Sequence, residues 1–198
     1  HGLLRRQRQM CIRDSTGSGA VSIALSADGK TAFVAENFKA LLKIIDVSDL
    51  TNPTLISTFD ASGSSAVGIT LSADGNTAFF SKSNYGLDII DISNKASPSL
   101  ISSYDTWGVQ SVTLSADGNT AFVSSASNGV HILDVSDLAN PTLTGNYRTT
   151  GRNLTDGVIH VTLSADENTA FVTSFYDGLE IIDLGLSFAN GDASVSTS

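Results

Sequence analysis

Short apolar runs alternate with polar turns along most of the chain, and the same pattern occurs four times. In each copy an apolar run such as VGITL (67–71) ends at Ser-Ala-Asp and a glycine or glutamate, and the Ser-Ala-Asp-Gly form favours a tight hairpin. A segment starting Thr-Ala-Phe follows, and then a run such as LDIIDI (87–92) that is apolar on both alternating faces. In three copies a proline (Pro53, Pro98 or Pro141) then opens a further strand. A full copy therefore predicts four short antiparallel β-strands, here called a to d.

The spacing of the copies predicts how these strands are arranged. The copies reach their first shared leucine at Leu25, Leu71, Leu114 and Leu163, which are 46, 43 and 49 residues apart. A period of this size is typical of stacked blades. We expect an all-β fold, a β-propeller of about four four-stranded blades, at residues 16–60, 66–105, 109–148 and 158–184. Because the fourth copy lacks a strand-d pattern after Asp183, and exposed strand edges favour aggregation, we expect a partial ring from a larger propeller.

The two ends of the chain do not share the pattern. Residues 1–15 hold four of the eleven basic residues and the only Met and Cys. They resemble translated sequencing adapter, so we interpret them as non-native; the alternative is a basic arm that binds nucleic acid or an anionic surface. Residues 185–198 are small and Ser-rich, which predicts a disordered tail or linker. The chain starts without Met, and we interpret it as a fragment.

Charge excludes several classes of partner. Residues 16–198 carry seven Lys and Arg against nineteen Asp and Glu, a net charge of −12. This balance repels nucleic acid and anionic lipid headgroups. No apolar run approaches the ~18 residues of a membrane span, so we expect no direct membrane insertion. Residues 16–198 contain no cysteine and hence no disulfide, which leaves the compartment open.

Binding residues are expected at one end of the blades. Most variation in length between copies falls in the d-to-a loops, which emerge at the same end as the b-to-c loops and opposite the uniform hairpins. Variable loops on a rigid scaffold commonly carry function. Aromatic rings beside amides and carboxylates suit contacts with sugar or protein, although ordinary loop packing is the alternative. The candidates at this end are Asn84, Tyr85, Trp107, Asn128, Asp156, Tyr176 and Asp177, with Asn37, Phe38, Arg148 and Arg152.

His160 is a further candidate, for a different reason. It occupies a strand-a position that holds Ser22, Gly68 and Ser111 in the other copies, and strand a lies nearest the propeller axis. We therefore expect its imidazole at the channel or its mouth, where it could bind a ligand or transfer a proton. His131 falls in a position with Lys43, and we expect it to be solvated.

The repeated aspartates have simpler interpretations. Asp28, Asp74, Asp117 and Asp166 could suggest calcium, but one carboxylate per turn is too few, so we assign them to the hairpins.

Asp46, Asp91, Asp134 and Asp183 each end strand c in a different blade, and we assign them to turns rather than to catalysis. Glu167 replaces the hairpin glycine, which strains that turn unless Asn168 takes the left-handed position. No catalytic or metal-binding motif is found, and we predict no cofactor.

The repeated segments resemble a known family. GLDIIDISNKASPSLISSYDT, VHILDVSDLANPTLTGNY and LLKIIDVSDLTNPTLISTF are similar to the LVIVD repeat. That resemblance implies propellers of bacterial and archaeal surface or secreted proteins, with a role in adhesion or surface interaction and no defined catalytic residues. The Ser-Ala-Asp-Gly hairpin also resembles that of lactonase-like propellers. This second resemblance implies an enzyme whose candidates near the channel mouth are His160, Asp156, Arg148 and Arg152.

These observations favour a non-enzymatic, extracellular or cell-surface module that binds a protein or glycan through its loop-rich end. A lactonase-like or other hydrolytic propeller is the alternative, and a purely structural spacer is a third possibility. The sequence leaves the oligomeric state open.

Overall fold

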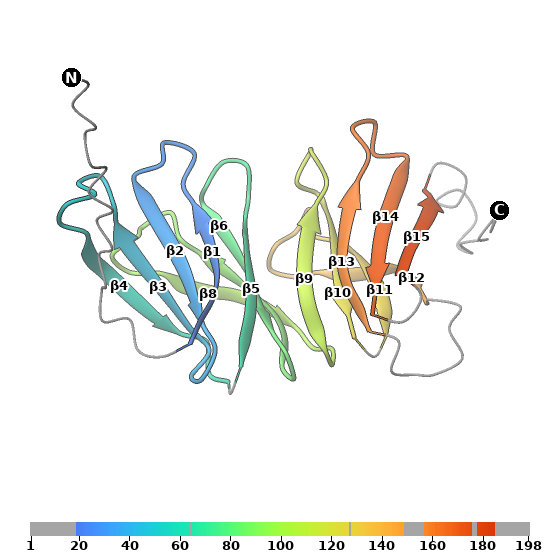
Figure 1. Ribbon diagram of the computed structural model, residues 1–198, viewed down its shortest axis with the longest axis horizontal. Coiled ribbons are helices and arrows are strands. Elements are labelled where there is room, and N and C mark those ends of the chain that lie inside the picture. The colour runs from blue at the N-terminus through green and yellow to red at the C-terminus, as the bar shows by residue number, and fades with distance from the viewer. Residues whose placement is uncertain (1–18, 64, 127, 149–156, 176–177, 185–198) are drawn as a thin grey trace, which may run out of the picture.

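The strands of the molecule fall where the repeated pattern predicts them (Figure 1). The structure, a computed structural model, describes residues 19–63, 65–126, 128–148, 157–175 and 178–184, and these residues form fifteen β-strands and no helix. In chain order the strands are β1 (Ala20–Leu25), β2 (Thr31–Glu36), β3 (Leu41–Asp46), β4 (Thr54–Asp60), β5 (Ala66–Leu71), β6 (Thr77–Lys82), β7 (Gly86–Asp91), β8 (Ser99–Tyr104), β9 (Val109–Leu114), β10 (Thr120–Ser125), β11 (Gly129–Asp134), β12 (Thr142–Tyr147), β13 (Val158–Leu163), β14 (Thr169–Ser174) and β15 (Gly178–Asp183).

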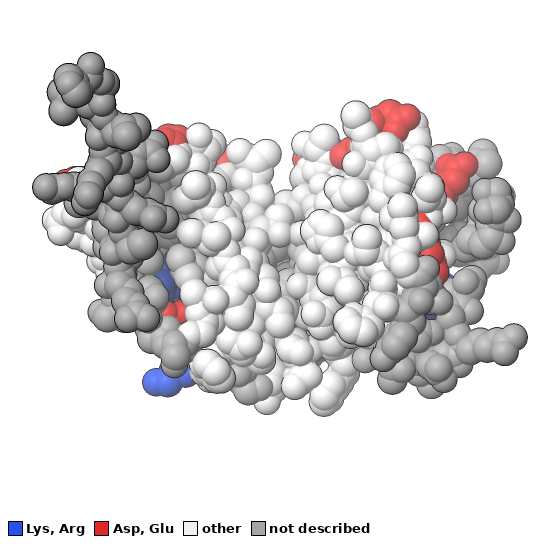
Figure 2. All heavy atoms as spheres, viewed as in Figure 1, with Lys and Arg blue, Asp and Glu red and all other residues white. Residues whose placement is uncertain are grey.

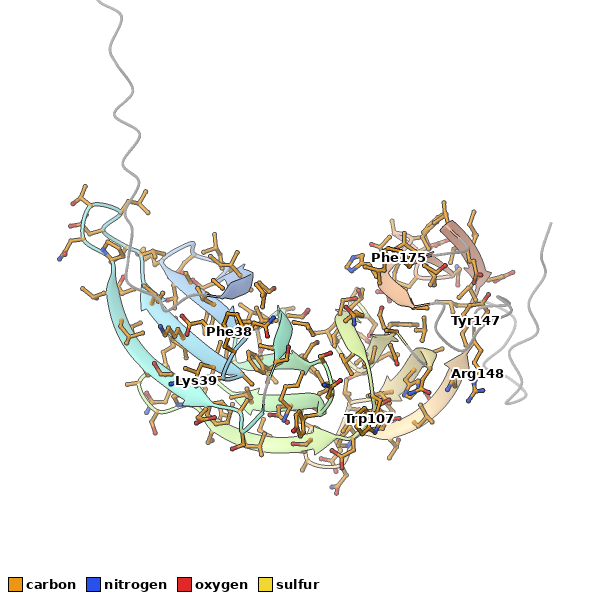
Figure 3. All side chains as sticks on the ribbon, turned by 60° about the horizontal axis from the view of Figure 1, so that its bottom comes forward. Phe38, Lys39, Trp107, Tyr147, Arg148 and Phe175 are labelled. Atoms are coloured by element: carbon orange, nitrogen blue, oxygen red, sulfur yellow. The ribbon has the colours of Figure 1, made fainter. Side chains whose placement is uncertain are left out.

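The strands form four antiparallel sheets, each built from strands that are consecutive in the chain. Blade 1 contains β1 to β4, blade 2 contains β5 to β8, blade 3 contains β9 to β12, and blade 4 contains β13 to β15. The sheets fan out in an arc, with β4, β8 and β12 along its convex side (Figure 3). The predicted fold class, propeller blades in a partial ring, is therefore confirmed. The predicted tail at residues 185–198 and the segment 1–15 lie outside the described residues.

The apolar core lies between the blades. Each blade has an upstream face toward the preceding blade and a downstream face toward the following one. At the seam between blades 1 and 2, Phe33, Leu42 and Ile44 of the downstream face pack against Ile69 and Phe80 of the upstream face. The other two seams repeat this arrangement. Strand c contributes to both seams, and for this reason β7 is buried along almost its whole length, as its apolar pattern predicts.

Hydroxyl groups on the strands also cross the seams, and four of them donate from one blade to the following one. The hydroxyl of Thr70 in β5 donates to the carbonyl of Val112 at 2.7 Å, and that of Thr113 in β9 donates to the carbonyl of Val161 at 2.5 Å. Serines in β4 and β8 make similar bonds to backbone carbonyls of the following blade. Blades 1 to 3 therefore each donate to the following blade, and these bonds help to align neighbouring sheets.

The a-to-b hairpins explain the repeated aspartates. In the first hairpin the carboxylate of Asp28 accepts the Ser26 hydroxyl at 2.6 Å and the Lys30 backbone N–H at 3.0 Å. The same bonds recur in the other three hairpins, and they lower the pKa of each aspartate below its usual value. In Figure 2, several acidic side chains lie along the upper edge of the molecule, where these hairpins project. The turn aspartates therefore serve the hairpins, as expected.

The aspartates at the ends of strand c act in the same way. The carboxylates of Asp46, Asp91 and Asp134 each accept the backbone N–H two residues later, at 2.8 to 2.9 Å. Bonds to the following serine lower the pKa of each of the three carboxyls. These carboxylates form hydrogen bonds within local turns, which agrees with the structural role predicted for them.

Two turns depart from the glycine pattern. Glu167 itself takes the left-handed conformation, with φ of +57°, so the alternative that Asn168 would take it is wrong. The b-to-c turn of blade 1, which has one extra residue, places Ala40 at φ +48°, whereas Gly86, Gly129 and Gly178 supply the positive φ in the other blades. A non-glycine residue in this region costs about 1 kcal/mol, and both blades tolerate it.

Candidate functional site

The b-to-c and d-to-a loops lie together at one end of the blades, which we call the loop face (Figure 3). Exposed aromatic side chains are found along this face in different blades: Phe38 in blade 1, Tyr85 in blade 2, Trp107 between blades 2 and 3, and Phe175 in blade 4. The loop face is therefore the part of the arc where the chemistry differs from blade to blade.

A pocket opens on the loop face of blade 2, between its b-to-c loop and the d-to-a loop that leads to blade 3. It has a volume of about 470 Å³ and is lined by Asn84, Tyr85, Asp105, Thr106 and Trp107. The indole of Trp107 is 68% exposed and the ring of Tyr85 is 50% exposed, so both present aromatic surface to solvent. The pocket is open to solvent on one side, so a ligand there would be only partly enclosed.

Backbone bonds hold the two pocket loops together. The N–H of Gly108, at the end of the d-to-a loop, donates to the carbonyl of Ser83 in the b-to-c loop at 2.6 Å. Gly86 closes the b-to-c turn with φ of +80°, and a Cβ at this position would lie 2.1 Å from the carbonyl oxygen of Tyr104. Only glycine fits so close an approach, so Gly86 lets the b-to-c turn that carries Tyr85 lie against the end of β8 in the same blade.

Blade 3 supports the pocket from the other side. The Ser125 hydroxyl donates to the Trp107 carbonyl at 2.6 Å, and the Asn128 side-chain amide lies 3.5 Å from the Thr106 hydroxyl. Thr106 is itself buried. Because the backbone of Trp107 is tied to blade 3, its exposed indole is carried on a fixed base rather than on a free loop.

A buried ion pair lies under the loop face in blade 2. Lys82 Nζ lies 2.7 Å from Asp88 Oδ2 and donates to the carbonyl of Ala61 in the preceding blade at 3.2 Å. The Ser103 hydroxyl donates to the other oxygen of Asp88 at 2.7 Å. Blade 1 has the opposite order of charges, with Glu36 on strand b and Lys43 on strand c, 2.8 Å apart. These pairs satisfy one another, which indicates a structural role.

The prediction that His131 is solvated is wrong. His131 occupies the position of Asp88 in blade 3, is only 7% exposed, and its Nδ1 lies 3.1 Å from the hydroxyl of Tyr104 in blade 2. The Tyr104 and His131 rings also meet edge to face, with centroids 5.9 Å apart. Burial lowers the pKa of His131, with a smaller contribution from Arg148, and burial raises the pKa of Tyr104. The burial of His131 could have been predicted, because the residues on both sides of it in strand c are apolar.

His160 lies apart from the pocket, on β13 of blade 4. Its imidazole is exposed, and its Nδ1 is 3.2 Å from the hydroxyl of Ser111 on the first strand of blade 3. Among the described residues no group of three His, Cys, Asp or Glu side chains is placed to hold a metal ion. Asp156, Tyr176, Asp177 and Arg152 lie outside the described residues.

The pocket thus unites three of the candidates, Asn84, Tyr85 and Trp107, and places Asn128 beside them. It adds two residues that the sequence reasoning missed, Asp105 and Thr106. Their signal was their position, since they belong to the same d-to-a loop as Trp107. The arrangement offers two aromatic surfaces, an amide and a carboxylate around one hollow. Such a set can stack on an apolar face of a ligand and orient its hydroxyl groups through hydrogen bonds.

No helix in the described part of the chain is long and apolar enough to cross a membrane.

Comparison with known proteins agrees with the repeat pattern. A family model described as the LVIVD repeat matches residues 19–61, 68–106 and 109–149. No curated protein matches the chain.

Three solved structures are similar to this chain in fold. The periplasmic gluconolactonase of Pseudomonas aeruginosa matches with a TM-score of 0.63 and 16% identity, over 78% of this chain and 50% of that one. A candidate 6-phosphogluconolactonase from Bacteroides uniformis gives a TM-score of 0.71 and 15% identity, over 83% and 50%. A protein from Lactobacillus plantarum gives 0.67 and 18%, over 83% and 56%. At these identities the likeness shows the fold alone, and the chain spans about half the length of each of these proteins.

Proposed function

Since the chain belongs to the LVIVD-repeat family, which defines its fold but no chemistry, we propose from the loop face that it is a non-enzymatic module that binds a glycan. The observation that supports this most directly is the loop-face pocket of blade 2, which the exposed Tyr85 and Trp107 line together with Asn84 and Asp105. Sugar rings have apolar C–H faces and hydroxyl edges, so they suit an aromatic surface with polar groups beside it. A protein partner that inserts a polar side chain is the second reading of the same pocket.

The location included in this proposal is the outside of a bacterial cell, either secreted or attached to the surface. The strongly acidic composition of residues 16–198 favours solubility in such a setting. Labelling of intact cells with an antibody against the protein tests this: signal only after permeabilisation would contradict it.

A glycan array probed with the full chain tests the function, followed by calorimetry on the strongest ligand. We expect Trp107→Ala to weaken binding about tenfold or more, because truncating a central aromatic contact typically costs at least 1.4 kcal/mol. Phe38→Ala is the matched control, since Phe38 is similarly exposed, at 71%, in the b-to-c loop of blade 1 and lies outside the pocket. Absence of any glycan binding, or an equal loss in both variants, would contradict the proposal.

Two solved structures with a similar fold are named as lactonases, at 15–16% sequence identity. Their names support the enzymatic alternative. In this chain the described candidates for such chemistry are His160 and Arg148, which lie on different blades. A lactone-hydrolysis assay on the wild-type chain and on His160→Ala decides it. Measurable hydrolysis that the substitution removes would favour the enzyme, and zero or equal rates would remove it.

A further inference from the structure

One carboxylate on the loop face differs from every other aspartate in the described part of the chain. The others each take part in a hydrogen bond, an ion pair or another electrostatic interaction, mostly within a local turn. Asp105, which lines the pocket of blade 2, is exposed and has no such partner among the described residues. Its carboxylate is therefore not needed to hold the loop together.

The equivalent residue of blade 1 makes the contrast clear. Asp60 follows β4 directly, as Asp105 follows β8, and the residues before them pair with equivalent leucines of strand c. The carboxylate of Asp60 accepts the backbone N–H of Ser62 at 2.9 Å. In blade 2 the residue two positions after the aspartate is Trp107, and its backbone N–H does not bond to Asp105 in this way. The same position thus serves the turn in one blade and faces a pocket in the other.

The other polar groups of the pocket are also left to solvent or to a ligand. The side-chain amide of Asn84 and the indole N–H of Trp107 form no hydrogen bond with any described residue. Beside them lie the exposed rings of Tyr85 and Trp107. The pocket therefore combines one negative charge with two aromatic side chains.

No positive charge in the pocket opposes that carboxylate, since none of the residues that line it is Lys, Arg or His. Lys82 lies beneath the loop face in the same blade, but it is buried and its ammonium is bound by Asp88 at 2.7 Å. The exposed Lys39 and Arg148 lie in other blades, apart from Trp107 (Figure 3). The pocket is thus set to attract a cation.

We propose, on the basis of the glycan binding inferred above, that this pocket selects sugar units that carry a free ammonium group, as in a glucosamine polymer. A cation is attracted to the face of an aromatic ring, which Tyr85 and Trp107 supply, and Asp105 provides the counter-charge. The Asn84 amide remains for a sugar hydroxyl. A uronic acid or other anionic sugar would meet an unpaired carboxylate and be rejected. The net charge of −12 over residues 16–198 adds a long-range attraction for cations.

Fluorescence of Trp107 tests the proposal directly, because it is the only tryptophan of the chain and it lines the pocket. The full chain is titrated at low salt with an oligomer of glucosamine and with the N-acetylglucosamine oligomer of the same length, which has no charge. We expect the glucosamine oligomer to bind about fivefold more tightly, which is what an exposed ion pair can contribute. Asp105→Asn should bind the two oligomers equally.

Asp60→Asn is the matched control. It changes the net charge of the chain by the same amount, at the equivalent position of blade 1 and outside the pocket, so the preference for glucosamine should persist. A preference lost in both variants would mean that net charge alone produces it, against the proposal. Equal binding of the two oligomers by the wild type, or a preference that Asp105→Asn retains, would overturn the proposal and leave glycan binding standing.

Two further outcomes separate this proposal from the general one. If neither oligomer binds but a glycan array shows another ligand, only the selection of ammonium sugars is wrong; if the whole array is silent, glycan binding is wrong as well. A lysine peptide of the same charge is the last probe. Binding of this peptide as tight as that of the glucosamine oligomer would contradict selection of a sugar and assign the pocket to a protein partner.

Discussion

Blades 2 and 3 hold different chemistry in the same buried position. In blade 2 the position holds a full ion pair, Lys82 with Asp88, 2.7 Å apart. In blade 3 it holds Ser125 and His131, and His131 is instead in contact with Tyr104 of the preceding blade. In blade 1 the position of Tyr104 is occupied by Phe59, whose side chain has no hydroxyl group to form such a hydrogen bond.

The difference shows what a repeat must preserve and what it can vary. Apolar contacts across the seams are nearly the same from blade to blade, because each face must fit both a predecessor and a successor. The polar positions under the loop face need only a local partner, which lies within the blade in one case and across the seam in the other. Substitutions at the two positions distinguish an ion pair within one blade from a contact across the seam.

Breaking the ion pair of blade 2 should have the largest effect. Asp88→Asn leaves the Lys82 ammonium buried without its counter-charge, which typically costs about 3–5 kcal/mol of stability. Urea unfolding followed by circular dichroism measures the loss. The double variant Lys82→Met with Asp88→Leu is the control, since an apolar pair of similar size often restores stability. Equal losses in the single and double variants would mean that the charge itself is unimportant.

Removing the Tyr104 hydroxyl, which contacts His131 of blade 3, should have a smaller effect. Tyr104→Phe deletes the bond to His131 Nδ1 and leaves a buried imidazole without that partner, at a cost of about 1–2 kcal/mol. Tyr85→Phe is the matched control on an exposed ring and should change stability by less than about 0.5 kcal/mol. The same urea titration checks both variants, and indistinguishable midpoints would contradict the assigned role.

The pH dependence of stability should distinguish the buried histidine of blade 3 from the ion pair of blade 2. Burial lowers the pKa of His131, whereas in the unfolded chain a histidine titrates near pH 6.5. The unfolded state therefore takes up the proton first, so stability is full above about pH 6.5 and falls as the pH drops below it. Protonation of His131 would also place a positive charge on a ring whose Nε2 is buried and has no hydrogen-bond partner among the described residues.

Unfolding midpoints measured between pH 7.5 and 5 check this expectation. His131→Gln keeps a polar group at the position but cannot titrate, so its midpoint should vary less over this range than that of the wild type. A wild-type profile as flat as that of the variant would show that His131 does not contribute to it.

The fold could be predicted from the sequence because its determinants are local and repeated. The Ser-Ala-Asp-Gly hairpin is held by bonds that span at most five residues, and strand c carries its burial on both faces in its own composition. The place of the binding candidates could also be predicted, because the loops that vary in length were expected at one end of the blades. Asn84, Tyr85 and Trp107 meet there in one pocket.

What the sequence did not reveal depends on contacts across a seam. His131 meets Tyr104, a residue 27 positions earlier in a different blade, and no pattern within one repeat indicates that pairing. The conformation of Glu167 was also undecided, since two adjacent residues could take the left-handed position. In both cases the outcome depends on what lies opposite the residue.

Because every seam joins the same two kinds of surface, blade number in this architecture is not tied to any one sequence. Excision of residues 66–108, one whole unit, would bring the Phe33, Leu42 and Ile44 surface against Val112 and Val123, residues of the type that it already contacts. Gene duplication or deletion in steps of one unit can thus lengthen or shorten such a protein without inventing a new contact.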